Sequence, residues 1–154
     1  MFGGLSTGEH FPSAGVRHCL AAQRALRARD WDTAAYLAGY AVECALKSIV
    51  GACGRAQGWS DQKVQKAMKV DGHDVAALRS SALSLASAVR PALSRYALPP
   101  HADVVAVETL WRPEQRYAPT GAVAPRVAGQ HMRAARKGMD AIRQAVLDGE
   151  LSLT

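Results

Sequence analysis

One segment of the chain, residues 36–47, is apolar on almost every side of a helix and yet carries two charged side chains. It reads Tyr-Leu-Ala-Gly-Tyr-Ala-Val-Glu-Cys-Ala-Leu-Lys. A helix that is apolar nearly all round must be covered on most sides. Glu43 and Lys47 lie four residues apart, so they share a face and can pair, whereas either charge buried alone would be costly. The segment therefore predicts the central helix of an all-α bundle, with a charged pair kept for packing or for a site.

The length of 154 residues is typical of one domain with a sizeable core. We expect a Gly-rich arm over residues 1–11, a single domain over 12–148 and a C-terminal tail over 149–154. No run approaches the roughly 20 uncharged apolar residues of a membrane span. The first residues also lack the basic and apolar segments of a secretory signal. These features predict a cytoplasmic protein without a membrane partner.

Hydrophobic periodicity, together with the Gly and Pro residues that interrupt it, predicts the helices. We expect Ser13 to cap the first helix, Asp30 or Asp32 to cap the second, Ser60 to start the third and Asp74 to cap the fourth. The second helix should end in Gly51–Gly54, and Pro91 should kink the fourth or end it near Arg90. The first two helices are expected to form an antiparallel hairpin. Val104, Val105 and Val107 would also suit a strand, but no second strand candidate exists to pair with it. The predicted helices cover residues 13–29, 33–52, 60–70, 74–97, 102–110 and 126–148.

The net charge of +6 permits a polyanionic partner such as RNA. We favour the simpler explanation that abundant arginine is spread over solvated helix faces, because no compact Lys/Arg block stands out. The three cysteines, Cys19, Cys44 and Cys53, have no Cys-x-x-Cys spacing, so we expect free thiols rather than a zinc site. We expect no metal and no cofactor.

Four segments together resemble the HEPN family of small helical domains. Residues 21–26 read Ala-Ala-Gln-Arg-Ala-Leu, and residues 31–47 end in the Ala-Val-Glu-Cys-Ala-Leu-Lys core that is similar to the family's second helix. Residues 73–78, His-Asp-Val-Ala-Ala-Leu, look like the family's His-Asp-Leu-x-x-Leu element. Residues 110–117 look like its late Arg-Tyr element. In this order and spacing, the resemblance covers about residues 12–148.

The resemblance implies an up-and-down bundle of four to five helices that forms a homodimer. HEPN relatives often sit beside a minimal nucleotidyltransferase, and many act as ribonucleases in bacterial toxin–antitoxin or defence systems. Others bind nucleotides or serve as scaffolds. We therefore expect a nucleotide- or RNA-related role, as a non-catalytic binding partner in such a system. A metal-independent endoribonuclease and a helical scaffold without a nucleic-acid role remain the alternatives.

Catalytic HEPN proteins carry an Arg, four to six intervening residues and a His. The cation can stabilise the charged transition state of RNA cleavage, and the imidazole can transfer a proton. Two such pairs meet across the family's dimer. Arg126 and His131 match this spacing at the start of the last predicted helix. Composition alone predicts between one and two matches, so the spacing by itself decides nothing.

Two features count against catalysis by these residues. Val127 follows the Arg directly, where active relatives have a polar residue, and Gly129 loosens the same turn. A second pair, Arg95 and His101, is kept in reserve, because two prolines between them prevent one helix from holding both side chains. The alternative for His131 is an exposed residue of the first helical turn.

Six further residues are candidates for binding, and each also has a structural interpretation. Glu43 and Lys47 can be a structural pair or a dimer-seam pair, and His73 can simply open a helix. Trp111 can stack on a base together with its neighbours, or it can plug the bundle. A buried Arg would need a carboxylate, for which Glu43 is the best candidate. The candidate binding residues are Glu43, Lys47, His73, Trp111, Arg116 and Tyr117.

Overall fold

The computed structural model describes residues 10–152, and every regular element in this part of the chain is a helix, without a strand. The all-α prediction is confirmed. The six α-helices of this part of the chain agree in number with the six predicted from the hydrophobic pattern and exceed the four to five that the family resemblance implies. Two of the six are only nine residues long. In chain order the elements are α1 (Phe11–Arg27), α2 (Trp31–Ala56), α3 (Asp61–Lys69), α4 (Val75–Val89), the 3-10 helix η1 (Pro91–Tyr96), α5 (Ala102–Leu110), the 3-10 helix η2 (Pro113–Tyr117) and α6 (Pro125–Leu147).

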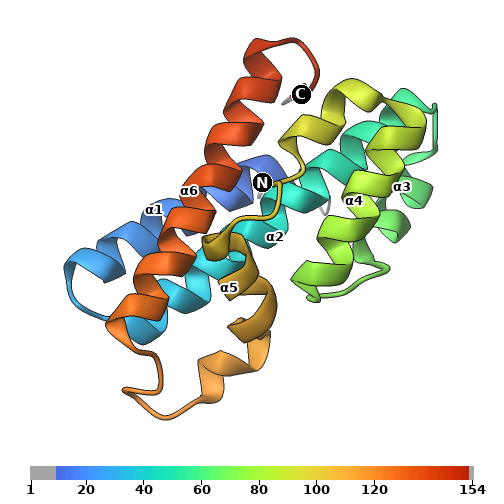
Figure 1. Ribbon diagram of the computed structural model, residues 1–154. Helices are drawn as coiled ribbons and strands as arrows, with labels where there is room; N and C mark the ends of the chain where they lie inside the picture. Colours follow the sequence, from blue (N-terminus) through green and yellow to red (C-terminus); the bar gives the residue numbers. More distant parts are fainter. Residues whose placement is uncertain (1–9, 153–154) are drawn as a thin grey trace, which may run out of the picture.

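Helix α2 is the centre of the bundle, as its apolar sequence predicts. It packs against α1, α3, α4 and α6 and also contacts both 3-10 helices. Figure 1 shows α1 and α6 along one part of α2 and α3 and α4 along the other. By length and composition alone α2 would be apolar enough to cross a membrane, but 89% of the apolar window is buried inside the bundle. Its apolar surface is therefore used for packing.

Helix α2 runs past the glycines that were expected to end it. A Cβ atom at Gly54 would lie 2.7 Å from the Trp59 ring, and one at Gly51 would lie 3.0 Å from the Met68 sulfur. Both glycines thus allow the segment leading into α3, and α3 itself, to approach the α2 backbone. They are sites of close packing rather than helix ends, which explains why the predicted end at residue 52 is wrong.

The helix starts follow the expected chemistry at three of four places. The side chains of Asp30, Ser60 and Asp74 each accept a hydrogen bond from the backbone N–H three residues on, at the starts of α2, α3 and α4. For α1 the prediction is wrong, because the helix begins earlier and His10, rather than Ser13, occupies the capping position. Helix α4 ends at Val89, just before Pro91, as predicted.

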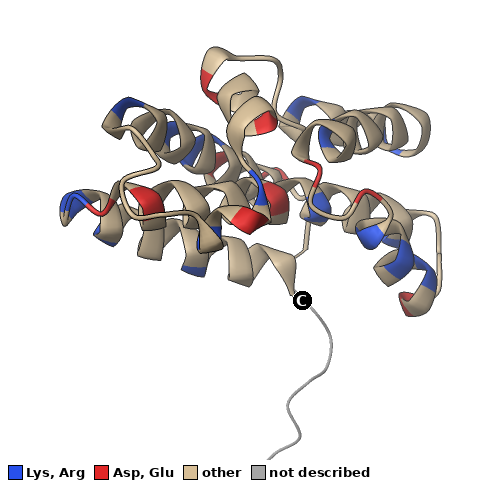
Figure 2. Ribbon diagram, turned by 90° about the horizontal axis from the view of Figure 1, so that it is seen from below, with Lys and Arg blue, Asp and Glu red and all other residues tan. Residues whose placement is uncertain are grey.

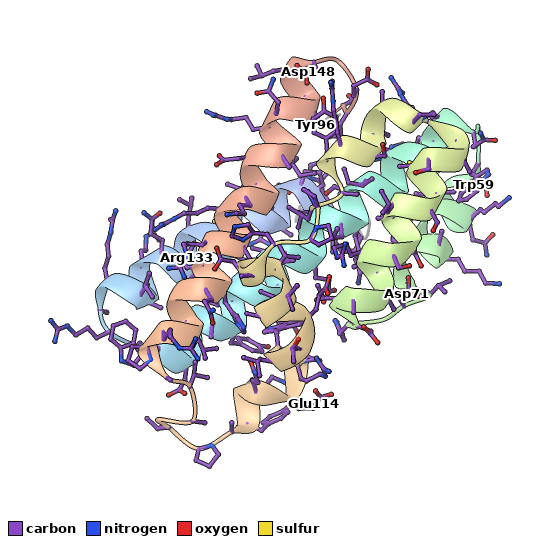
Figure 3. All side chains as sticks on the ribbon, viewed as in Figure 1. Trp59, Asp71, Tyr96, Glu114, Arg133 and Asp148 are labelled. Atoms are coloured by element: carbon purple, nitrogen blue, oxygen red, sulfur yellow. The ribbon has the colours of Figure 1, made fainter. Side chains whose placement is uncertain are left out.

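The segment after α6 folds back onto the bundle. Leu151 is buried in the core, and Glu150 pairs with Arg90 at 2.9 Å. The Tyr96 hydroxyl and Arg95 both bond to Asp148, and Tyr96 and Asp148 are seen together at the end of α6 in Figure 3. Residues 149–152 therefore belong to the packed domain. The predicted arm over residues 1–11 lies largely outside the described residues, and Phe11 already begins α1.

Candidate functional site

The predicted pair of Glu43 and Lys47 is confirmed, and a third side chain joins it. Lys47 Nζ lies 2.7 Å from one carboxylate oxygen of Glu43, and His73 Nδ1 lies 2.8 Å from the other. Glu43 and Lys47 are almost fully buried, whereas the His73 side chain remains 49% exposed. Glu43 thus holds a buried ammonium on one side and orients an accessible imidazole on the other.

The His73 pocket, as we call it, is a cavity of about 790 Å³ between the start of α1, the middle of α2 and the turn before α4. Its lining includes three permanent cations, Arg17, Lys47 and Lys69, against the single carboxylate of Glu43. Histidines 10, 18 and 73 also line it. The described lining therefore holds more permanently positive than negative side chains, which favours an anionic ligand.

Tyr40 is the aromatic centre of this pocket. Its ring centroid lies 5.6 Å from that of His18, 5.8 Å from that of His73 and 5.0 Å from that of Trp111. Burial, together with its contact to Tyr36, raises the pKa of Tyr40 well above the ordinary range. Burial and the nearby Arg17 lower the pKa of His18. Both groups are thus held neutral around pH 7, as hydrogen-bonding groups rather than charges.

Trp111 plugs the bundle and does not offer a surface for stacking. Its side chain is fully buried, its Nε1 donates to the Tyr36 carbonyl at 3.0 Å, and its ring lies against the backbone of Gly39. Trp111 was predicted to bind a ligand, but its buried ring cannot touch one. It supports the wall of the pocket through its contact with Tyr40.

Arg116 and Tyr117 lie outside the His73 pocket, on η2. Both are exposed, and the Arg116 guanidinium sits 4.8 Å from the centre of the Tyr117 ring. Arg116 interacts with the Tyr36 side chain, which raises its pKa. The suggested link between Arg116 and Glu43 is therefore wrong, because Lys47 and His73 already occupy the Glu43 carboxylate. Arg116 lines a separate cavity together with Arg29, and the carboxylates of Asp30 and Asp32 balance the two guanidinium charges.

The structure does not bring Arg126 and His131 together within one chain. Arg126 is exposed at the start of α6, whereas His131 is completely buried, so the expectation of an exposed His131 is wrong. Five residues along a helix place the two side chains about 140° apart around its axis. Burial lowers the pKa of His131, and the nearby backbone of Ala35 and Ala106 offsets part of that decrease. Neither ring nitrogen forms a hydrogen bond of ordinary geometry with the described residues. In this position the imidazole has no contact with solvent.

The reserve pair is also separated into two different contacts. Arg95 bonds to the Tyr96 hydroxyl and to Asp148, near the end of α6. His101 instead caps α5 and lies 3.5 Å from the Asp103 carboxylate.

The buried carboxylate of Asp103 also lies close to two cations of α6. Arg133 lies 3.3 Å and Lys137 3.6 Å from its carboxylate. Burial alone would raise the pKa of Asp103, but Arg133, His101 and Lys137 hold it below its ordinary value. His101 is thus part of a structural ion-pair cluster, and this cluster does not include Arg95.

Sequence reasoning missed Arg17, His18 and Tyr40 as parts of the pocket. His18 and Tyr40 lie on the predicted first and second helices, and the hairpin between those helices was anticipated. The antiparallel pairing of the two helices is the signal that could have found them. It places the first turns of α1 beside the middle of the longer α2. No periodicity rule, however, states which polar residues of two helices will face each other.

Within residues 10–152, no group of three or more His, Cys, Asp or Glu side chains is arranged to hold a metal ion. Cys44 and Cys53 are buried and Cys19 is partly buried, and burial raises the pKa of the Cys53 and Cys19 thiols.

Comparisons of the chain with protein-family models, with curated proteins and with solved structures find no match.

Proposed function

We propose that the protein binds a nucleotide or a short RNA segment through its phosphate groups, in the His73 pocket, and acts as a non-catalytic partner in a toxin–antitoxin or defence system. The observation that carries this proposal is the described lining of the pocket, in which the one carboxylate, Glu43, already binds both Lys47 and His73. The exposed Arg17 guanidinium and the accessible His73 ring are therefore the groups that an entering anion meets.

The walls of the pocket suit the rest of a nucleotide. Tyr40 offers a ring beside the charged groups, and stacking of a base on an aromatic ring contributes about 1–3 kcal/mol. His73 can donate or accept a hydrogen bond through its second ring nitrogen, while Glu43 holds the first. The volume of about 790 Å³ lies within the range of small-molecule sites. The ligand class follows from this combination of cations and an aromatic ring.

The partner part of the proposal rests on the resemblance of residues 12–148 to HEPN domains. Such domains often accompany a minimal nucleotidyltransferase, a class of enzyme that uses nucleoside triphosphates. A binding partner with its own nucleotide site would suit that arrangement. Figure 2 shows Lys and Arg distributed over most of the helices.

The test measures thermal stabilisation and titration calorimetry with nucleoside mono-, di- and triphosphates, with a short single-stranded RNA and with inorganic phosphate. A ligand present at 100 times its Kd should stabilise the fold by about 2.7 kcal/mol. Arg17→Ala and His73→Ala should weaken binding, whereas Arg24→Ala, an exposed arginine of α1 outside the pocket, should not. Absence of stabilisation by every probe, or equal losses in all three variants, would overturn the proposal.

A further inference from the structure

The cavity that Arg116 lines is the second feature of the molecule that suits a ligand. It has a volume of about 780 Å³ and lies between the turn that joins α1 to α2 and the 3-10 helix η2, and we call it the η2 cavity. Trp31 and Tyr36 supply aromatic lining, and Thr33 and Gln115 supply polar groups. Its described lining holds as many carboxylates as guanidinium groups, unlike that of the His73 pocket. A flat, uncharged ring with polar edges suits this lining better than a phosphate does.

The side chains of Tyr36 and Tyr40 connect the η2 cavity to the His73 pocket. Tyr36 lines the η2 cavity, and Tyr40 lines the pocket. The two tyrosines lie four residues apart on α2, so they share one face, and their ring centroids are 5.0 Å apart. Arg116 interacts with the Tyr36 side chain and is also close enough to act on Tyr40. The two cavities are therefore neighbours, with the contact between Tyr36 and Tyr40 between them.

An exposed aromatic ring lies beside the η2 cavity. Tyr117 directly follows Arg116 on η2, and its side chain is 77% exposed. The Arg116 guanidinium lies 4.8 Å from the centre of the Tyr117 ring. An aromatic ring and a guanidinium in this arrangement both offer a flat surface on which a nucleobase can stack.

We propose that the η2 cavity is a second ligand subsite, and that the ligand of the protein is a dinucleotide, in which phosphate joins two nucleosides. This inference rests on the proposed function, because the His73 pocket would hold the phosphate and the first nucleoside. The second base would enter the η2 cavity and stack on Tyr117 and Arg116. The excess of cations suits the phosphate, and the charge-balanced aromatic cavity suits the base, so the two compartments match the two parts of one ligand.

The experiment is titration calorimetry on the full chain with ADP and with diadenosine diphosphate, in which a diphosphate joins two adenosines. The two probes share one adenosine and both phosphates and differ in the second adenosine. Diadenosine diphosphate carries less negative charge than ADP, so charge alone would make it bind more weakly. It should nevertheless bind at least about fivefold more tightly, which corresponds to the lower end of what one base gains by stacking on an aromatic ring.

The diadenylate pApA serves as a third probe, because two consecutive nucleotides of a single strand share the chemistry of a free dinucleotide. It should also bind more tightly than ADP. A lower Kd for pApA than for diadenosine diphosphate would identify a strand as the source of the ligand, and the opposite order would identify a free dinucleotide. Either order supports the second subsite.

Substitutions on η2 test where the second base binds. Tyr117→Ala and Arg116→Ala should abolish the preference, so that both dinucleotides bind about as tightly as ADP. Arg112→Ala is the matched control and should preserve it, because Arg112 is exposed beside η2 and is not among the described residues that line either cavity. His73→Ala should weaken the binding of all three probes. Circular dichroism verifies that each variant is folded.

The outcomes separate this inference from the proposed function. Equal Kd values for ADP and both dinucleotides would overturn the second subsite and leave phosphate binding in the His73 pocket intact. A preference for dinucleotides that survives both Tyr117→Ala and Arg116→Ala would do the same. Binding of none of the three probes would overturn the proposed function, and the second subsite with it.

Discussion

The indole ring of Trp111 occupies the space that a side chain at Gly39 would need. A Cβ atom at position 39 would lie 2.1 Å from Trp111 Cδ1, well inside van der Waals contact. Trp111 also holds its place through the hydrogen bond to the Tyr36 carbonyl and through the Tyr40 ring. The glycine of α2 and the tryptophan after α5 therefore act as one packing unit behind the His73 pocket.

We expect Gly39→Ala to destabilise the protein although alanine favours helices. Overpacking a filled core costs about 1–3 kcal/mol, more than the gain of up to about 1 kcal/mol from replacing a helical glycine. Gly129→Ala is the control, because its Cβ would meet only the Arg133 side chain at 3.5 Å, and it should stabilise α6. Chemical denaturation of both variants measures the difference. Equal stabilisation by both would show that Trp111 can move at little cost.

Glu43→Ala should destabilise the fold strongly, because it leaves the Lys47 ammonium buried without its carboxylate. The expected loss is about 3–5 kcal/mol in the free energy of unfolding. His73→Ala removes the exposed partner of the same carboxylate and should cost much less. The double variant Glu43→Leu with Lys47→Met should recover much of the loss, since no buried charge remains. A Glu43→Ala melt within a degree or two of the wild type would contradict this view of the pair.

Stability should fall as the pH drops below about 6.5, because His131 is buried in its neutral form. Its pKa in the folded protein is lowered, so the unfolded chain binds a proton at a higher pH than the folded one. The stability that this group contributes is fully present above its unfolded pKa and is lost as the pH falls toward the folded pKa. One such group changes the free energy of unfolding by about 1.4 kcal/mol per pH unit in that window.

The measurement is the melting temperature of the wild type and of His131→Leu from pH 7.5 to 5. The variant should show the flatter profile. His18, whose pKa is also lowered, acts in the same direction, so His18→Ala serves as the comparison. Profiles that are parallel for the wild type and His131→Leu would show that His131 does not titrate differently on unfolding.

We expect no metal-independent cleavage of RNA by the wild type, because His131 lies in the core and Arg95 and His101 belong to separate contacts. The assay uses structured and single-stranded RNA with a chelator present. Loss of a catalytic acid or base lowers a rate by roughly 10²–10⁴. Cleavage that disappears in His131→Ala and persists in His101→Ala would overturn the expectation and assign the activity to Arg126 and His131.

The local rules predicted most of the secondary structure because they depend on near neighbours in the chain. Asp30, Ser60 and Asp74 cap helices through a backbone group three residues away, and Pro91 ends α4 through its own ring. The apolar character of residues 36–47 likewise predicted a buried central helix. Gly51 and Gly54 misled the same rules, because their role depends on Met68 and Trp59.

The sequence by itself determined an all-helical domain built around α2 and a pair between Glu43 and Lys47, because a 3.6-residue period fixes which side chains of one helix share a face. Only the tertiary structure decided that His73 joins this pair, that Arg17, His18 and Tyr40 complete the pocket, and that His131 is buried. These contacts join residues on different helices. Their positions depend on how far each helix is rotated and shifted against its neighbours, which follows from the packing of the whole core rather than from any local pattern.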